Sequence, residues 1–408
     1  MFLVKSIDET MKLIRDNFSN YNLKTKKILI SESLNYISAE DIISKEDVPH
    51  FNRSIVDGYA VDFNSVKLAT SSTPSILKLN GTVLMGKESF DLVTPSTTVY
   101  VPTGGHLPIG ANAAVMIENT ETLGEEIIIN KSVSINENVL LKGSDISKGQ
   151  IIVSENTLIT PLVIGSLKAI GMKEITVFEK LTSLVISTGD EIVNDKEELD
   201  IGEIRDINTY TVSNNLKNKN IIVNESFIIK DNFEEYKAAV LKGFETSDII
   251  FTSGGSSVGD KDYTLAILED IGAELLVHGI SIKPGKPSII AKYNNKLFFG
   301  LPGQPTSAFF VLNTFINEIV NTIYHLNDVL PTPYFEAKLD TNVHSSTGRR
   351  MYQLVHIMKK NNEFIATPLF AKSGMIHSLK LASGYIIVDE FSEGYIANSI
   401  VKVYRLGD

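Results

Sequence analysis

The chain has 408 residues, of which 43% are hydrophobic and 21% are charged, which is typical of a soluble globular protein of about two to four domains. Its formal net charge of -11 argues against bulk attraction to nucleic acid or to an anionic membrane surface. It has no cysteine, which excludes disulfides and thiolate chemistry, and its seven histidines lack the spacing of zinc ligands. Neither a long apolar span nor a signal-peptide pattern is present, so we expect a cytoplasmic protein with no membrane segment.

The first predicted element is a helix of about twelve residues, since Ser6 and Glu9 form a capping-box pattern and apolar residues follow at helical spacing. Residues 26–46 predict a strand and a short helix. Residues 47–140 contain short β-prone runs separated by Ser, Thr, Gly and Pro, which predicts an antiparallel β domain.

A second helix is predicted where Thr160 and Pro161 provide a start signal and Gly171 an end signal. Because this helix and the N-terminal one each carry one apolar face, we expect them to pack together. Residues 1–46 and 141–178 are therefore predicted to form a mixed, α-rich linking domain.

Residues 179–326 alternate apolar strands with amphipathic helices, which predicts a three-layer α/β/α domain with a largely parallel sheet. The strand candidates are 183–188, 221–229, 248–253, 275–281, 288–293 and 297–301. The helix candidates are 208–218, 233–245, 262–271 and 305–326. Residues 327–408 are strand-rich again and predict a small β-barrel or sandwich. The expected fold class is thus an elongated, multidomain α/β protein.

A glycine-rich loop at residues 252–263 follows the apolar strand and precedes a helix. Glycines let backbone amides approach a ligand closely, and a helix N-terminus adds unpaired N–H donors. Gly254, Gly255 and Ser256 are therefore predicted to cradle an anion. Asp262, at the end of this loop, is a candidate catalytic carboxylate and also a candidate helix cap.

Two lysines on a proline-containing turn, Lys283 and Lys286, form the second motif. Ordinarily such lysines are solvated, but two cations held close together repel each other unless an anion is present. The pair therefore predicts a doubly charged oxyanion as ligand. A third turn follows at residues 300–305, where Pro302, Gly303 and Pro305 lie between a strand and a helix that is able to receive a phosphate.

The order and content of these motifs resemble the MoeA family of molybdopterin molybdenumtransferases, to which the gephyrin E domain also belongs. The resemblance covers nearly the whole chain. It is carried by seven segments, namely Pro49–Ala60, Pro102–Gly105, Ser187–Glu191, Gly202–Asn208, the Gly254-Gly255 loop, Lys283–Pro287 and Gly300–Gly303. Small departures occur at Gly105, Ser256 and Gln304, where the family usually has alanine, valine and asparagine.

The resemblance implies insertion of molybdate into adenylylated molybdopterin with release of AMP, assisted by Mg²⁺. It also implies a homodimer in which the active cleft lies between the α/β domain of one subunit and the β domain of the other. Other molybdenum-cofactor synthesis proteins are implied as possible partners.

The resemblance further assigns roles to individual residues. The implied catalytic residues are Asp57, Glu191, Asp262, Lys283 and Lys286. The implied ligand-binding residues are Thr103, Asp206, Gly254, Gly255, Ser256, Pro302, Gly303, Pro305, Arg350 and Ser373. The implied metal ligands are Asp57, Asp145, Glu191 and Asp248.

Simpler readings exist for some of these residues. Asp57 and Gly58 form a common hairpin-turn signal, and the paired arginines Arg349 and Arg350 can be ordinary surface charges. Three alternatives to the molybdate-dependent transferase also remain at this point. They are a non-catalytic scaffold like the gephyrin E domain, a nucleotide-binding hydrolase with the same topology, and a transferase that uses tungstate.

Overall fold

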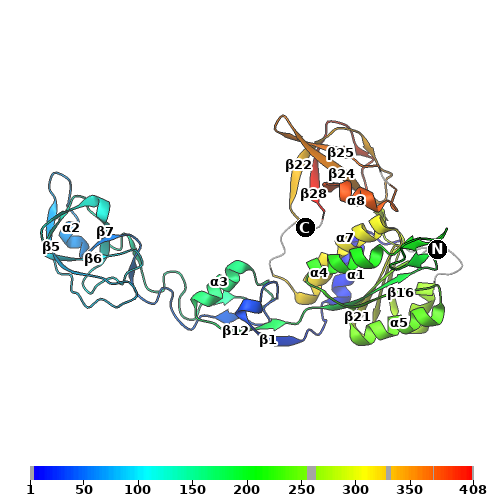
Figure 1. Ribbon diagram of the computed structural model, residues 1–408, viewed down its shortest axis with the longest axis horizontal. Coiled ribbons are helices and arrows are strands. Elements are labelled where there is room, and N and C mark those ends of the chain that lie inside the picture. Colours follow the sequence, from blue (N-terminus) through cyan, green and yellow to red (C-terminus); the bar gives the residue numbers. More distant parts are fainter. Residues whose placement is uncertain (1–3, 255–262, 328–331, 371, 407–408) are drawn as a thin grey trace.

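The computed structural model describes residues 4–254, 263–327, 332–370 and 372–406. The molecule is elongated, with a β domain at one end, a small linking domain in the middle, and the α/β domain with a C-terminal barrel at the other end (Figure 1). The predicted multidomain α/β fold class is therefore confirmed. Among the described residues, no helix is both long and apolar enough to cross a membrane.

The β domain contains a six-stranded sheet in the order β7-β4-β6-β5-β9-β8. Its strand pairs are antiparallel as predicted, except that β5 and β6 run parallel. Valine, leucine and isoleucine side chains from both faces are buried. The elements are β4 (Gly58–Val61), α2 (Phe63–Val66), β5 (Ser75–Thr82), β6 (Thr97–Val101), β7 (Ala113–Met116), η2 (Ile117–Asn119), β8 (Thr120–Leu123) and β9 (Glu126–Ile129).

The linking domain is built from segments on either side of the β domain in the sequence. Three short antiparallel pairs, β1–β12, β2–β11 and β3–β10, join the outgoing and returning chains. Its helix, α3, begins after Thr160, whose side chain caps the Val163 amide, as predicted. The elements are β1 (Thr25–Leu29), η1 (Ile30–Glu32), β2 (Ile42–Ile43), β3 (Arg53–Ser54), β10 (Val139–Leu140), β11 (Ile151–Val153), α3 (Pro161–Ala169) and β12 (Glu174–Phe178).

The N-terminal helix α1 (Ile7–Phe18) has the predicted capping box, but its predicted packing partner was wrong. Its apolar face enters the core of the α/β domain against α7 (Pro305–Tyr324), rather than packing on α3. Arg15 of α1 also pairs with Glu318 of α7 at 2.7 Å. An amphipathic pattern establishes that a helix must cover an apolar surface, but it does not say which surface. The helix therefore belongs with the α/β core, although the sequence grouped it with the linking domain.

The α/β domain has a six-stranded sheet in the order β16-β13-β17-β21-β20-β18. The first four strands are parallel, and the last two are antiparallel additions. Helices α1, α4 and α7 cover one face, while α5 and α6 cover the other. This is the predicted three-layer arrangement.

The bounds of these elements follow the predicted ranges closely. The strands are β13 (Thr182–Thr188), β14 (Ile192–Val193), β15 (Ile204–Arg205), β16 (Ile222–Ile229), β17 (Ile249–Ser253), β18 (Glu274–His278), β20 (Ile289–Tyr293) and β21 (Lys296–Leu301). The helices besides α1 and α7 are α4 (Asn208–Asn218), α5 (Phe233–Thr246) and α6 (Tyr263–Asp270).

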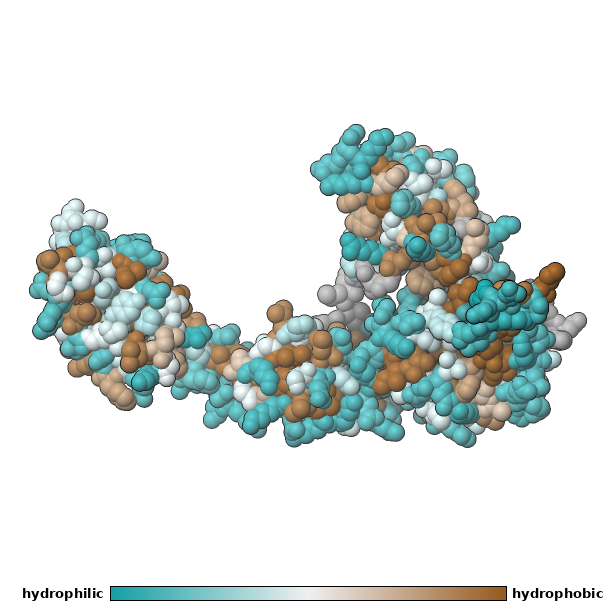
Figure 2. Space-filling view, in the orientation of Figure 1, coloured by the Kyte–Doolittle hydropathy of each residue, from teal (hydrophilic) through white to brown (hydrophobic). Residues whose placement is uncertain are grey.

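The C-terminal domain is a closed barrel, because β24 pairs with both β25 and β26 around the ring β24-β25-β22-β28-β26. The short strand β19 adds to β24 and thereby joins the barrel to the α/β domain. The elements are β19 (Ile282–Lys283), β22 (Tyr334–Leu339), β23 (Val343–His344), β24 (Arg350–Lys360), β25 (Glu363–Pro368), α8 (Ile376–Leu381), β26 (Gly384–Val388), β27 (Gly394–Tyr395) and β28 (Ile400–Arg405). Figure 2 shows that the β domain and the barrel stand apart, with an open concave face between them.

Candidate active site

Three parallel strands of the α/β sheet end side by side at the candidate site. Ser187 of β13 is in register with Ser253 of β17, which is in register with Leu301 of β21. In open α/β sheets, ligands bind beyond such carboxyl ends. A cavity of about 1030 Å³ lies there, between the α/β domain and the barrel.

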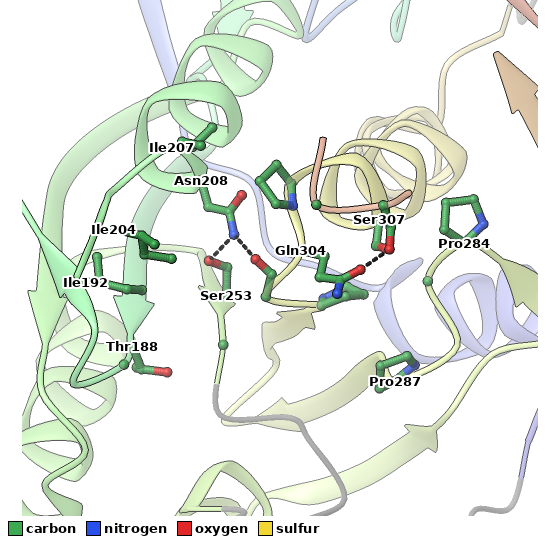
Figure 3. A pocket seen from close by; sticks show the side chains of 18 of the residues that line it. Thr188, Ile192, Ile204, Ile207, Asn208, Ser253, Pro284, Pro287, Gln304 and Ser307 are labelled. Atoms are coloured by element: carbon green, nitrogen blue, oxygen red, sulfur yellow. Dashed lines mark hydrogen bonds between the residues drawn. The ribbon is translucent and has the colours of Figure 1, made fainter. Parts of the chain in front are cut away.

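The cavity is lined by turns that follow the strands, together with the lysine turn and two short segments of the barrel. Its lining residues are Thr188, Gly189, Glu191, Ile192, Ile204, Arg205, Asp206, Ile207, Asn208, Asp231, Ser253, Gly254, Ile282, Lys283, Pro284, Gly285, Lys286, Pro287, Pro302, Gly303, Gln304, Pro305, Ser307, Arg349, Ser373 and Gly374. The three motif regions identified in the sequence are therefore brought together by the fold. Figure 3 shows how these side chains surround the space.

Gly254 allows the turn after β17 to lie directly against the turn after β13. Its φ is +97°, and a Cβ at this position would lie 2.3 Å from the carbonyl oxygen of Thr188. The turn after β21 is in van der Waals contact with it, since a Cβ on Gly303 would lie 3.5 Å from the Cα of Gly254. The close approach of these three turns requires glycine at position 254.

The lysine turn is closed by hydrogen bonds of its own backbone and side chains, and its Lys283-Pro284 peptide bond is cis. The Ile280 amide donates to the carbonyl of Lys286 at 2.9 Å, and the Ser288 hydroxyl donates to the carbonyl of Gly285 at 2.8 Å. Gly285 is buried against Val311, whereas both lysines are exposed and line the cavity. The predicted pair of cations is therefore held on a defined turn that faces the site.

The barrel contributes Arg349 and Ser373 to the cavity. The Ser373 hydroxyl donates to the side-chain oxygen of Gln304, and the Thr306 amide donates to the Ser373 carbonyl at 3.1 Å. These bonds join the barrel to the N-terminus of α7. The sequence analysis assigned Arg350 to the ligand, but a guanidinium nitrogen of Arg350 lies 3.9 Å from the carboxylate of Asp8 in α1. The arginine that lines the cavity is the adjacent residue, Arg349.

Acidic side chains line the opposite wall, and Glu191 is among them. The ammonium group of Lys230 donates to the carbonyls of Asp190 at 2.7 Å and Ile192 at 2.9 Å, which fixes the backbone on both sides of Glu191. Asp206 accepts from the Ser187 hydroxyl and the Thr209 amide, both at 3.1 Å, while its other carboxylate oxygen is buried and finds no partner in the described part of the chain. The cavity thus has a cationic wall and an acidic wall.

Asp57 and Thr103, also predicted for the site, lie together in the β domain. The Thr103 amide donates to the Asp57 carboxylate at 2.9 Å. This turn precedes β4 and follows β6, in the lobe at the far end of the molecule from the cavity (Figure 1). One chain therefore does not bring Asp57 to Glu191 or to the lysine turn.

Two predicted metal ligands lie elsewhere in the chain. Asp145 is exposed in the returning connection, where its amide donates to the Val48 carbonyl. Asp248 precedes β17 and therefore lies at the opposite edge of the sheet. Its carboxylate accepts from the Tyr21 hydroxyl and from the amide and hydroxyl of Thr182, at 2.8 and 2.7 Å. These bonds occupy Asp248 in joining the α/β domain to the chain that enters from α1.

A Mg²⁺ site does not form from the predicted ligands within a single chain. In the described ranges, no group of three or more acidic or histidine side chains is placed to share a metal ion. Asp57, Asp145, Glu191 and Asp248 lie in four separate places. Gly255, Ser256 and Asp262 of the glycine-rich loop fall outside the described residues.

The sequence assignments missed several residues that line the cavity, including Asn208, Gln304, Ser307 and Arg349. Asn208 closes the Gly202–Asn208 segment that was already singled out, so its position in that segment was an available signal. Gln304 likewise follows the Pro302-Gly303 pair. Ser307 carried no local signal, because it is one residue within a helix.

Comparison with known proteins agrees with the motifs. Residues 5–171 match the family profile for the MoeA N-terminal region (domain I and II), residues 184–322 match a probable molybdopterin binding domain, and residues 336–406 match the MoeA C-terminal region (domain IV). A molybdopterin molybdenumtransferase of Haemophilus influenzae is 31% identical over 93% of this chain and 93% of its own. One from Bacillus subtilis is 29% identical over 93% and 89%.

The fold has solved counterparts as well. The crystal structure of a molybdopterin biosynthesis MoeA protein from Pyrococcus horikoshii is 30% identical, covers 99% of both chains and has a TM-score of 0.78. A second structure of a MoeA protein from the same organism has a TM-score of 0.81 at 26% identity. An elongated α/β protein with a cavity at its strand ends is the class that the geometry defines. The chain belongs to the MoeA family.

Proposed function

We propose that this protein is a molybdopterin molybdenumtransferase, which inserts molybdate into adenylylated molybdopterin with release of AMP. The observation that carries the proposal is the convergence of three strand-end turns and the lysine turn on one cavity of about 1030 Å³. Such a volume suits an extended ligand that has both a heterocycle and phosphate groups. The names of the relatives in Haemophilus influenzae and Bacillus subtilis support the same activity.

In this proposal the cationic wall holds the anions. Lys283 and Lys286 attract the molybdate dianion, and Arg349 offers a guanidinium that can grip an oxyanion through two parallel hydrogen bonds. The N-terminus of α7, which begins at Pro305 beside the cavity, adds a favourable dipole for a phosphate. These groups position the oxyanion beside the dithiolene of the bound molybdopterin.

The acidic wall takes part in proton transfer. When the two dithiolene sulfurs bind molybdenum, one oxo ligand of molybdate is replaced and leaves as water. The two protons that this water requires can come from the two thiols, which become thiolate ligands. Glu191 and Asp206, on the opposite wall, can accept and return protons during this exchange. Hydrolysis of the phosphoanhydride-like bond consumes a water, releases AMP and makes the sequence irreversible. Most of the rate acceleration would come from positioning.

We further propose that the working unit is a homodimer in which the β domain of one copy completes the cavity of the other. The support is that Asp57 and Thr103 are fixed against each other on an exposed turn of the β domain, far from the cavity of their own chain. Mg²⁺ remains a prediction, and no step of the proposed chemistry runs through it. Action in the cytoplasm and contact with other cofactor-synthesis proteins remain predictions too.

The test is conversion of adenylylated molybdopterin to active cofactor by the purified protein, with AMP release measured in parallel. The proposal expects active cofactor to form only when molybdate is present. Equal AMP release without molybdate, and no cofactor formed, would identify a hydrolase. Absence of both products would leave the scaffold role. Repeating the assay with tungstate tells whether the site discriminates between the two oxyanions.

A further inference from the structure

A buried asparagine at the start of α4 connects two of the ligand turns. Asn208 is 6% exposed, and its side-chain nitrogen donates to the hydroxyl of Ser253 at 3.0 Å and to the carbonyl of Gly303 at 2.7 Å. Ser253 ends β17 and precedes the glycine-rich loop, whereas Gly303 lies in the turn between β21 and α7. Figure 3 shows the carboxamide spanning the space between the two turns.

The surrounding contacts extend this connection to the turn after β13. The hydroxyl of Ser187 lies 3.4 Å from that of Ser253, and it hydrogen bonds to Asp206 at 3.1 Å and to Thr209 at 2.9 Å. The network therefore lies directly beneath the cavity and includes the end of each neighbouring strand. Asn208 is the member that reaches the turn after β21.

The other half of the Asn208 carboxamide is unsatisfied. Its side-chain oxygen is buried and has no hydrogen-bond partner among the described residues. A buried acceptor without a partner destabilises the fold, so folding alone gives little reason for asparagine at this position. Nor does the residue cap its helix, because the Thr209 amide at the start of α4 is bonded by Asp206. The contribution of Asn208 to the site is therefore the pair of hydrogen bonds that it donates to Ser253 and Gly303.

We infer that Asn208 is a positioning residue for the proposed transfer reaction: it holds the Ser253-Gly254 and Pro302-Gly303 turns at the spacing that lets both contact one bound molybdopterin substrate. This inference rests on the proposed function. The lysine turn is closed by its own hydrogen bonds and is not connected to Asn208 by any bond among the described residues. Loss of the Asn208 bonds therefore disturbs the binding of the substrate but not the capture of molybdate.

The experiment compares Asn208→Ala and Asn208→Asp with Asn214→Ala. Aspartate keeps the shape of asparagine but cannot donate, so it should behave like alanine. Asn214 lies on the same helix but is exposed, and its side chain bonds only to the Tyr210 carbonyl of its own helix among the described residues, which makes it a matched control. Each variant is assayed for kcat and KM with adenylylated molybdopterin, for molybdate affinity and for melting temperature.

Both Asn208 variants should lower kcat/KM about tenfold or more, mainly through a higher KM, while molybdate affinity stays within about twofold of wild type. Asn214→Ala should match wild type. A merely structural role would lower the melting temperature and both affinities together. That outcome, or unchanged kcat/KM in both Asn208 variants, would overturn the inference.

Hydrogen exchange provides a readout that does not depend on activity. In the Asn208 variants, amides of residues 249–254 and 300–306 should exchange faster, while those of residues 279–288 should not change. If the wild-type protein shows no transferase activity but these exchange differences appear, the proposed function fails and the positioning of the turns stands. Unchanged exchange in both turns contradicts the positioning role whatever the activity.

Discussion

The backbone amide of Thr103 donates a hydrogen bond to the carboxylate of Asp57 at 2.9 Å, and this pair lies in the lobe opposite the cavity. The bond fixes the direction of the Asp57 carboxylate, which belongs to no group of three or more possible metal ligands among the described residues. Within one chain, the residues that the motifs assign to a single site thus fall into two groups. A dimer that joins the β domain of one copy to the cavity of another would reunite them.

The first prediction concerns the lysine turn. Lys286→Ala should weaken molybdate binding by about tenfold to a hundredfold, because a hydrogen bond to a charged group is worth about 1.5–3 kcal/mol. Folding should be unaffected, since the Lys286 side chain is exposed. Isothermal titration with molybdate measures the change. Lys12→Ala, which removes the same charge from the exposed face of α1, is the control. Wild-type affinity in Lys286→Ala would remove the turn from anion binding.

The second prediction separates the two adjacent arginines. Arg349→Ala should lower kcat/KM by about tenfold, because Arg349 lines the cavity and its guanidinium can hold an oxyanion. Arg350→Ala should change kcat/KM by less than about threefold, since Arg350 lies beside Asp8 instead. Steady-state kinetics of the two variants measure this difference in kcat/KM. The reverse order of effects would mean that Arg350 turns into the site when the ligand binds.

The third prediction concerns the hydrogen bond between Tyr21 and Asp248, at the edge of the sheet opposite the cavity. Burial and the hydrogen bond to Asp248 raise the pKa of the Tyr21 hydroxyl above its usual value of 10.0. Tyr21→Phe should lower the free energy of unfolding at pH 8 by about 1 kcal/mol through loss of this bond. The folded state holds the phenol proton more tightly than the unfolded state, so the stability that Tyr21 contributes is complete below pH 10 and is lost as the pH rises above it.

The difference between wild type and Tyr21→Phe should therefore shrink as the pH rises above 10. Urea unfolding at several pH values measures it. Tyr210→Phe, an exposed tyrosine on α4, is the matched control and should show little effect at any pH. A difference that stays constant, or grows, with rising pH would contradict a stabilising hydrogen bond between Tyr21 and Asp248.

The elements of the α/β domain were predictable because each one depends on a local pattern. The helix 208–218 was located from its periodicity alone, and the glycine and lysine turns followed from residue types whose backbone or charge has a direct consequence. The strand order, in which β20 runs antiparallel to both of its neighbours β21 and β18, depends on pairings between distant segments. No local pattern records such pairings.

Two site assignments and the packing of α1 show the same limit. Adjacent residues at the start of a strand point in opposite directions, so the choice between Arg349 and Arg350 depended on the register of β24 against β19. The sequence already indicated that Asp248 begins its strand rather than ending it, and the sheet places that end opposite the cavity. The partner of α1 depended on which apolar surface was left uncovered by the rest of the fold.

The most direct test of the shared site combines two chains that each lack one residue of it, with molybdate held well below the Kd of Lys286→Ala so that this variant is nearly inactive. Asp57→Asn and Lys286→Ala are expressed together with different tags, and the heterodimer is purified through both tags and assayed for cofactor formation. Asparagine can still accept the Thr103 amide bond, so the β-domain turn should remain intact.

If each cavity is completed by the partner, the heterodimer contains one site with both native residues and one site with neither. It should then recover about half of the wild-type rate per dimer, while both parent homodimers remain inactive. If each chain forms its own site, every site in the heterodimer carries one substitution. A heterodimer as inactive as its parents would contradict the shared cavity.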